Sequence, residues 1–291
     1  MEGIMDFLII LSLCTLATAK VTLQSRFGKK GIKSDADNVL FNAIVFLTAA
    51  ALFCADIPKA SLATQLFALT FAIFTVAFQL SYTKALSVGN VSLTVMVVNL
   101  SMLFPTLVSV IFYHESLTPT RIIGILLTVL SFALTVDFKA KGKLSHAWFI
   151  LTAVAALANG GIGITQKIFG AQSVNTEKKA FVACSYAIAF LVAVALYFCM
   201  RSREKDPQNT KRNIGKTYMF AVAVGSILAV FQWLNTYAVS VMDGSFLFPI
   251  YSGGSIILST LVGILFFKDK LTKRQKISIT LGTVAVVIMN L

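Results

Sequence analysis

The chain has 291 residues, of which 57% are hydrophobic and only 13% charged, and its formal net charge at pH 7 is +13. A soluble domain averages about 45–50% apolar and about 25% charged residues, so this composition excludes an ordinary globular enzyme. Most of the chain divides into apolar runs of about 17–24 residues, long enough to cross roughly 30 Å of hydrocarbon as helices. The sequence therefore predicts an all-α integral membrane protein.

In chain order, the apolar runs predict ten transmembrane helices. We expect them at residues 4–24, 38–55, 62–83, 91–113, 121–137, 147–167, 180–200, 217–239, 245–267 and 276–291. Turn-forming or charged residues separate them. The first run has no preceding basic segment and no small-residue cleavage site, so we expect it to remain as a span and not to be removed as a signal peptide.

Lysine and arginine are unevenly distributed between the two sets of predicted loops. The loops after spans 1, 3, 5, 7 and 9 hold 19 of the 25 basic residues, and the opposite loops hold 4. Because basic loops stay in the cytoplasm, we expect both termini on the non-cytoplasmic side of the cell (plasma or inner) membrane. This topological role accounts for the net charge, so no nucleic-acid partner is expected.

The residues needed for a metal site or for hydrolytic chemistry are scattered. The cysteines, at positions 14, 54, 184 and 199, lie in apolar runs without CxxC spacing. His114 and His146 lie in different loops, and no glycine-rich phosphate loop or Ser/His/Asp arrangement occurs. We expect no metal, no cofactor and no enzymatic activity.

An internal repeat is the strongest single signal in the chain. Residues 78–88 (FQLSYTKALSV) and residues 231–241 (FQWLNTYAVSV), which lie 153 positions apart, are identical at six of eleven positions. Residues 111–118 match residues 265–272 after one inserted residue. We therefore expect two five-helix repeats, at 1–143 and 144–291.

An odd number of helices in each repeat makes the second repeat cross the membrane in the opposite orientation. The charges agree, because the 115–121 loop has one basic residue and the equivalent 268–276 loop has five. Inverted repeats of this kind are typical of secondary transporters that work by alternating access, with the substrate near the membrane midplane.

Several motifs resemble the EamA repeat of the drug/metabolite transporter superfamily. These are Tyr82-Thr83-Lys84-Ala85-Leu86-Ser87 with Ser92, then Pro105, Glu115-Ser116-Leu117-Thr118 and Gly124. The region around Lys20 is similar to the end of the family's first span, and Gln166-Lys167 takes that place in the second half; Asp269 replaces the usual glutamate. The resemblance covers essentially the whole chain. It implies a ten-helix exporter or importer of small organic metabolites without a cofactor.

Polar side chains inside the spans are candidates for substrate contact, since they avoid lipid and face the bundle interior. We expect such contacts from Asn99, Asn159, Tyr251 and Ser252, with Thr15, Thr18 and Trp233 beside them. The alternative is close helix packing for the small polar residues and interfacial anchoring for Trp233.

A second set of residues lies nearer the span ends. Gln79 and Gln232 are repeat equivalents about seven residues, or roughly 10 Å, past their span centres, and we expect them to act as gates with Tyr82 and Asn235. Lys20 and Lys167 are the charges inside spans, near the C-terminal ends of their helices. They either attract an anionic or zwitterionic substrate, or extend to the interface and complement the helix dipole.

No carboxylate is expected at the midplane, where exchange of cations against protons would require one. We therefore expect transport of a neutral, zwitterionic or weakly anionic metabolite such as an amino acid. The alternatives are an exporter of cationic drugs or amines, and a lipid flippase-type protein or membrane-embedded enzyme. The expected partners are the small-molecule substrate and membrane lipids, and a monomer is compatible with the pattern.

Overall fold

The computed structural model describes residues 2–32, 34–89, 91–116, 118–135, 145–202, 214–267 and 273–289. Within these ranges every regular element is a helix, which confirms the all-α prediction. The elements are α1 (Glu2–Gly31), α2 (Asp35–Ala51), η1 (Cys54–Lys59), α3 (Leu62–Val88), α4 (Val91–Asn99), η2 (Leu100–Met102), α5 (Leu103–Tyr113), α6 (Pro119–Thr135), α7 (His146–Gly170), η3 (Ser173–Glu177), α8 (Lys178–Arg201), α9 (Ile214–Val241), α10 (Gly244–Phe267) and α11 (Lys273–Met289).

The described part of the chain contains five helical segments long and apolar enough to cross a membrane. They are Ile4–Gly28, Leu62–Val88, His146–Gly170, Ser173–Arg201 and Tyr218–Val241. Three shorter apolar segments accompany them, at Val97–Tyr113, Pro119–Ser131 and Gly244–Ser259. The chain is therefore a multi-pass membrane protein.

The predicted spans differ most from the observed helices at two places. α1 continues to Gly31, seven residues beyond the predicted end of the first span at residue 24. The fourth predicted span, 91–113, consists of α4, the 3-10 turn η2 and α5. Pro105 lies in the first turn of α5 and lacks the amide hydrogen that an uninterrupted α-helix would use there, which explains the tightened turn before it.

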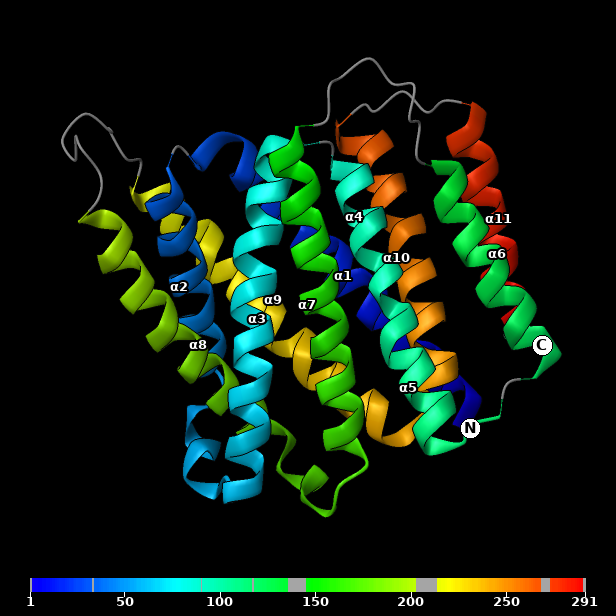
Figure 1. Ribbon diagram of the computed structural model, residues 1–291, viewed down its shortest axis with the longest axis horizontal. Coiled ribbons are helices and arrows are strands. Elements are labelled where there is room, and N and C mark those ends of the chain that lie inside the picture. The colour runs from blue at the N-terminus through cyan, green and yellow to red at the C-terminus, as the bar shows by residue number, and fades with distance from the viewer. Residues whose placement is uncertain are drawn as a thin grey trace.

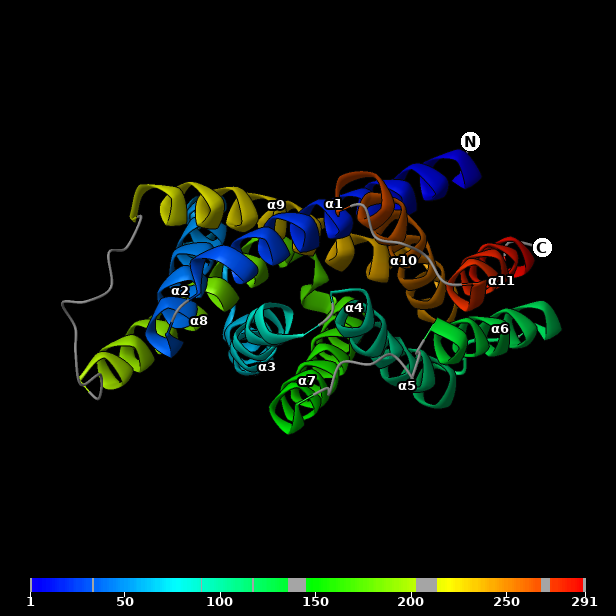
Figure 2. The same ribbon diagram turned by 90° about the horizontal axis from the view of Figure 1, so that it is seen from above.

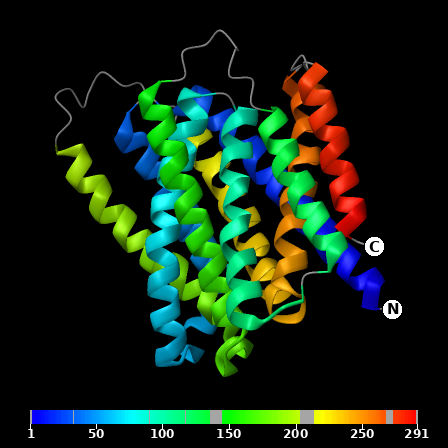
Figure 3. The ribbon, with the colours of Figure 1, turned by 45° about the vertical axis from the view of Figure 1, so that its right-hand side comes forward.

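The helices form a bundle in which the two halves of the chain interleave. α2 packs against α8 and α9, α3 against α7 and α8, and α1 against α9 and α10. α6 and α11 form a pair at one edge (Figures 1 and 2). The upper end of α8 leans outward at the opposite edge (Figure 3). Both chain termini lie at the lower end of the bundle in Figure 1.

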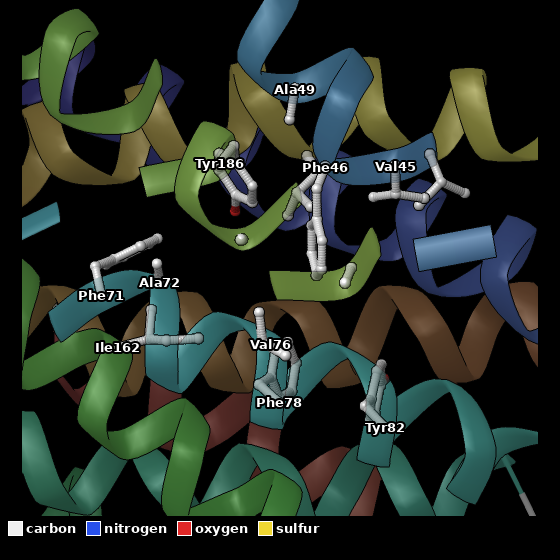
Figure 4. Close-up of a cluster of buried hydrophobic side chains, with 14 of the residues drawn as sticks. Val45, Phe46, Ala49, Phe71, Ala72, Val76, Phe78, Tyr82, Ile162 and Tyr186 are labelled. Atoms are coloured by element: carbon white, nitrogen blue, oxygen red, sulfur yellow. The ribbon is translucent and has the colours of Figure 1, made fainter. Parts of the chain in front are cut away.

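The main apolar core lies between α2, α3 and α8, where aromatic side chains alternate with small ones (Figure 4). Phe71 packs edge-on against Phe181, with ring centroids 5.1 Å apart, and Phe46 lies 6.0 Å from Tyr186. Ala49 is fully buried beside them. Small residues let membrane helices approach closely, and this packing replaces the hydrophobic driving force that lipid does not supply.

Gly225 marks a close contact between α2 and α9. A Cβ atom added at Gly225 would lie 2.6 Å from the backbone oxygen of Val45, whereas one added at Gly215 would meet nothing within 4 Å. We predict that Gly225→Ala lowers the free energy of unfolding by about 1–3 kcal/mol, because a backbone atom cannot move aside as a flexible side chain can. Gly215→Ala, on the same helix, should be neutral or slightly stabilising. Thermal unfolding of the purified protein compares the two, and equal effects would contradict this contact.

Candidate functional site

Two adjoining cavities, with volumes of about 50 and 30 Å³, lie where α1, α3, α4 and α5 meet α7, α9 and α10. The larger one, the Lys20 cavity, is lined by Ala17, Thr18, Lys20, Val21, Phe78, Tyr82, Val95, Val98, Asn99, Asn159, Phe231, Gln232, Tyr251, Ser255 and Ser259. The smaller one, the Ser252 cavity, is lined by Ser101, Met102, Pro105, Asn159, Ile162, Gly163, Gln166, Phe231, Gln232, Asn235, Phe248, Tyr251 and Ser252. In this conformation each has room for only a few water molecules.

Most of the residues predicted to contact substrate or to form gates line these cavities. The Lys20 cavity contains Thr18, Lys20, Tyr82, Asn99, Asn159, Gln232 and Tyr251. The Ser252 cavity contains Asn159, Gln232, Asn235, Tyr251 and Ser252. Asn159 connects the two halves directly, because its side-chain amide donates a hydrogen bond of 2.6 Å to Ser101 Oγ.

Lys20 lies deep in the bundle and not near the end of its helix. It precedes the end of α1 by eleven residues, which corresponds to about 16 Å of helix. Only 7% of the residue is exposed. Its ammonium lies 5.3 Å from the ring centroid of Phe78 and 5.7 Å from that of Phe231, two residues that are equivalent in the internal repeat.

Within the described residues, the Lys20 ammonium has no hydrogen-bonding or carboxylate partner. Its neighbours are the two aromatic faces and the polar, uncharged lining of the cavity. A buried charge without a counter-charge costs several kcal/mol, more than the about 2 kcal/mol that a desolvated cation–π contact supplies. Such an arrangement is typical of a functional residue in a membrane protein.

Lys167 has a different environment, which corrects the expectation that the two lysines occupy equivalent positions. It lies three residues before the end of α7 and forms an ion pair with Glu115, and the side chains of both residues are 9% exposed. In this conformation Glu115 neutralises Lys167, which lines neither cavity.

Three other predicted residues also lie outside the cavity linings. Thr15 is exposed, and its hydroxyl donates to the backbone oxygen of Leu11, 2.7 Å away within the same helix. Trp233 packs against the main apolar core, 6.4 Å from the ring of Phe53. Gln79 is buried between α1 and α3. The structure thus separates these residues from the cavity residues.

Two glutamine pairs hold corresponding helices together in the two halves. Gln24 Nε2 on α1 donates to Gln79 Oε1 at 2.9 Å and to Thr83 Oγ1 at 2.7 Å on α3. Gln166 Nε2 on α7 donates to Gln232 Oε1 at 3.0 Å and to Thr236 Oγ1 at 2.9 Å on α9. The acceptors Gln79 and Thr83 lie 153 positions before Gln232 and Thr236, so Gln24 and Gln166 correspond although they lie outside the matching segments 78–88 and 231–241.

A short sequence signal accompanies these pairs. Residues 24–28 and 166–170 both read Gln-x-x-Phe-Gly. A Cβ added at Gly28 would lie 3.6 Å from the backbone nitrogen of Ser87, and one added at Gly170 would lie 3.5 Å from that of Ser240. The glycines therefore permit the same close helix crossing in each half, at serines that are themselves repeat equivalents. This alignment pairs Lys20 with Ile162 and Lys167 with Ser25.

Glu115 connects three segments at the end of the bundle where both termini lie. Besides Lys167, it accepts hydrogen bonds from the backbone amides of Gly244 (3.2 Å) and Ser245 (2.8 Å) at the start of α10. A carboxylate at a helix N-terminus is favoured by free amides and by the helix dipole. Burial raises the pKa of Glu115, but the hydrogen bonds from Lys167 and from these amides outweigh that effect and leave the pKa below its usual value.

We predict that Glu115→Gln lowers the free energy of unfolding by about 2–4 kcal/mol, because it leaves the buried Lys167 ammonium without a counter-charge. Asp243→Asn removes the exposed Arg121–Asp243 pair at the same end and should cost less than about 1 kcal/mol.

The stabilisation by Glu115 should depend on pH. Because the pKa of Glu115 is lower in the folded state, its contribution to the free energy of unfolding is complete above the unfolded pKa of about 4.3 and is lost as the pH falls through the folded value. The difference in Tm between wild type and Glu115→Gln should therefore hold from pH 7 to pH 5 and shrink below about pH 4; a difference that fades near neutral pH would contradict this.

The arrangement of the halves agrees with the comparison to known proteins. The chain matches the EamA-like transporter family over residues 6–137 and again over residues 146–291. It belongs to this family. A solved crystal structure is similar over 97% of this chain and 95% of its own, with a TM-score of 0.71 at 14% identity, which shows a shared fold. No curated protein is significantly similar to the chain.

Membership of the EamA family places the chain among the membrane transporters of the drug/metabolite transporter superfamily. The Glu-Ser-Leu-Thr motif by which the first half resembles the family begins with Glu115, and in this EamA protein the glutamate fixes the start of α10. Its counterpart in the second half, Asp269, lies outside the described residues. Within the described residues, no group of three His, Cys, Asp or Glu side chains could hold a metal ion.

Proposed function

We propose that this EamA protein is a secondary transporter that moves a small organic metabolite across the membrane by alternating access. In this proposal ten helices form two inverted five-helix repeats, residues 1–143 and 144–291, and the substrate binds where they meet. The single observation that carries the proposal is the pair of cavities between the halves, in which Asn99 from the first half and Asn159 and Tyr251 from the second lie together.

Matched contacts support the inverted repeat. The Gln24–Gln79 and Gln166–Gln232 pairs connect corresponding helices. α1 begins at the lower end of the bundle and α7 at the upper end (Figure 1), so these corresponding helices run in opposite directions. An inverted pair of structural units can exchange conformations, and each exchange moves the opening of a central site from one side to the other.

The glutamine pairs support a role in holding each half together better than they support gating. Each pair joins helices of the same half, α1 with α3 or α7 with α9, so it need not break when the halves move relative to each other. The Glu115 contacts, by contrast, join the α5–α6 connection of the first half to α7 and α10 of the second. Relative movement of the halves has to break them.

The basic residues support an orientation for this transporter. We place the upper end of Figure 1 in the cytoplasm, because α1, α3 and α8 end there, next to predicted loops that carry lysine and arginine. Both termini are then on the outside of the cell membrane, as is the Glu115 ion pair. An outward-open state would have to release the Glu115 contacts on that side.

The alternative of a cation exporter receives less support from the cavity. Among the described residues, no aspartate or glutamate lines either cavity, so a positively charged drug would have no counter-charge there. Lys20 adds electrostatic repulsion. A lipid flippase needs a polar route open to the bilayer, whereas these cavities lie between helices in the centre of the bundle.

Uptake into proteoliposomes with a panel of labelled amino acids, organic acids, sugars, nucleosides and amines tests the proposal. We predict saturable uptake of at least one compound, and a roughly tenfold or greater loss of apparent affinity in Asn159→Ala, which removes a polar group shared by both cavities. Thr70→Ala, an exposed threonine whose hydroxyl bonds within α3, is the matched control and should transport normally. Lipid flipping without flux of any compound would contradict the transporter function.

A further inference from the structure

We propose that the cargo is an organic monoanion whose anionic group binds directly to Lys20 and supplies the counter-charge that the protein lacks. This inference rests on the transporter function proposed above and narrows its substrate class. It starts from the position of Lys20, which is buried and lines the larger cavity, and whose ammonium lies over the rings of two phenylalanines.

The unpaired charge is the first argument. Lys167, the other lysine inside a predicted span, is neutralised by Glu115. At Lys20 the phenylalanine faces offset only part of the cost of burial. An anion that enters the Lys20 cavity offsets the remaining cost of burying this charge, so electrostatics strongly favour the binding of an anion there.

The polar groups around Lys20 provide the second argument. Tyr82, Asn99, Tyr251 and Ser255 line the same cavity, and their hydroxyl and amide groups can donate hydrogen bonds to the oxygens of a carboxylate. Within the described lining there is no acidic side chain that could pair with a substrate ammonium. One positive charge with neutral donors therefore favours a cargo with net charge −1 over a zwitterion and, more strongly, over a cation.

The adjoining Ser252 cavity indicates where the rest of the cargo lies. It shares Asn159, Phe231, Gln232 and Tyr251 with the Lys20 cavity, and its other walls are uncharged. A carboxylate at Lys20 thus leaves the remaining, uncharged part of the molecule against amides, hydroxyls and aromatic faces. The loaded site as a whole is electrically neutral, which lowers the cost of enclosing it in the membrane.

A series of nearly isosteric probes that differ in charge tests this inference. Lactate carries −1, lactamide and the zwitterion alanine carry no net charge, and alaninamide carries +1; phenyllactate and its counterparts extend the series to a larger aromatic body. Thermal unfolding of the full-length protein in detergent is measured with each probe at increasing concentration. Wild type is compared with Lys20→Met, which keeps a similar side-chain volume but removes the charge, and with Lys84→Met, which removes a lysine already paired with Asp35.

We expect lactate or phenyllactate to raise the Tm of wild type and of Lys84→Met, alanine to act more weakly, and alaninamide to have no effect. In Lys20→Met the apparent affinity for the active anion should fall by at least about tenfold. Equal shifts with the amide, shifts that persist in Lys20→Met, or no anion with a Lys20-dependent shift would overturn the inference. If liposome flux is carried only by neutral or cationic compounds, the transporter function stands and the anion assignment fails; if no compound moves, the proposed function itself fails.

Discussion

Replacement of Lys20 by methionine is expected to make the protein more stable and its transport much weaker. Methionine fills a similar volume, and its thioether makes favourable contacts with the rings of Phe78 and Phe231. Removal of a buried, unpaired charge should raise the free energy of unfolding by several kcal/mol, and loss of the cation–π contacts should lower it by about 1–2 kcal/mol. We therefore expect a net increase of about 1–3 kcal/mol. The measurement is thermal unfolding by intrinsic fluorescence, alongside uptake in liposomes.

The direction of this change separates a functional lysine from a structural one. A lysine that holds the fold together loses stability when it is truncated, as Lys167 should because Glu115 is then left unpaired. Lys84→Met is the matched control, since the exposed Lys84–Asp35 pair should contribute less than about 1 kcal/mol and lies away from the cavities. A Lys20→Met protein that unfolds earlier than wild type, or that transports at the wild-type rate, would contradict the assignment.

A disulfide between α5 and α10 is expected to stop transport reversibly. A Cβ added at Gly244 would lie 3.3 Å from Cβ of Ser109, close to the about 3.5–4.5 Å that a disulfide requires. Ser109→Cys with Gly244→Cys therefore joins the two halves beside the Glu115 contacts, which have to separate if the halves rock. Uptake should fall to the level of empty liposomes after oxidation and recover after reduction, in a variant whose native cysteines have been replaced.

A cross-link within one half serves as the control. A Cβ added at Gly28 would lie 3.7 Å from Cα of Ser87, so a short bifunctional thiol reagent can link cysteines at these positions and join α1 to α3. The Gln24–Gln79 pair already holds these helices together, so movement between the halves should tolerate the link. Transport that continues after oxidation of the Ser109–Gly244 pair, or that stops with the Gly28–Ser87 link, would contradict movement between the halves at the contact of α5 with α10.

Much of the architecture was predictable because membrane helices depend on apolar length, which is visible in the sequence. Helix ends were less predictable: α1 extends to Gly31 through Gln24, Ser25 and a basic stretch. Gln24 and Ser25 are fully buried against other helices, so they remain helical at a depth where a hydropathy count ends the span. That error placed Lys20 near a helix end and concealed its position in the centre of the bundle.

Polar residues inside apolar spans were the sequence signal that predicted the cavity residues. Asn99, Asn159, Tyr251 and Ser252 stand out in apolar sequence, and the structure places all four in the cavity linings. Polarity alone does not separate them from Gln79, whose partner Gln24 is 55 residues away in the chain. Only the second occurrence of Gln-x-x-Phe-Gly, at 166–170, could have indicated that these glutamines join helices within each half.

Lys20 and Lys167 show most clearly what the sequence lacks. Both are lysines inside apolar runs, and the property that distinguishes them is whether a carboxylate from a distant part of the chain lies beside them. Glu115, 52 residues before Lys167, provides this partner, and no described residue does so for Lys20. Pairing across the bundle is decided by tertiary packing, which local patterns do not encode.

The central claim is that one cavity between the halves opens alternately to the two sides of the membrane, and chemical labelling of that cavity tests it most directly. Asn159→Cys, in a variant without the four native cysteines, places one thiol in the wall shared by both cavities. Small membrane-impermeant methanethiosulfonates, one anionic and one cationic, are applied to right-side-out and to inside-out vesicles. We predict modification from both sides, faster with the anionic reagent because Lys20 lines the cavity. Modification from one side only, or none from either side, would contradict the account.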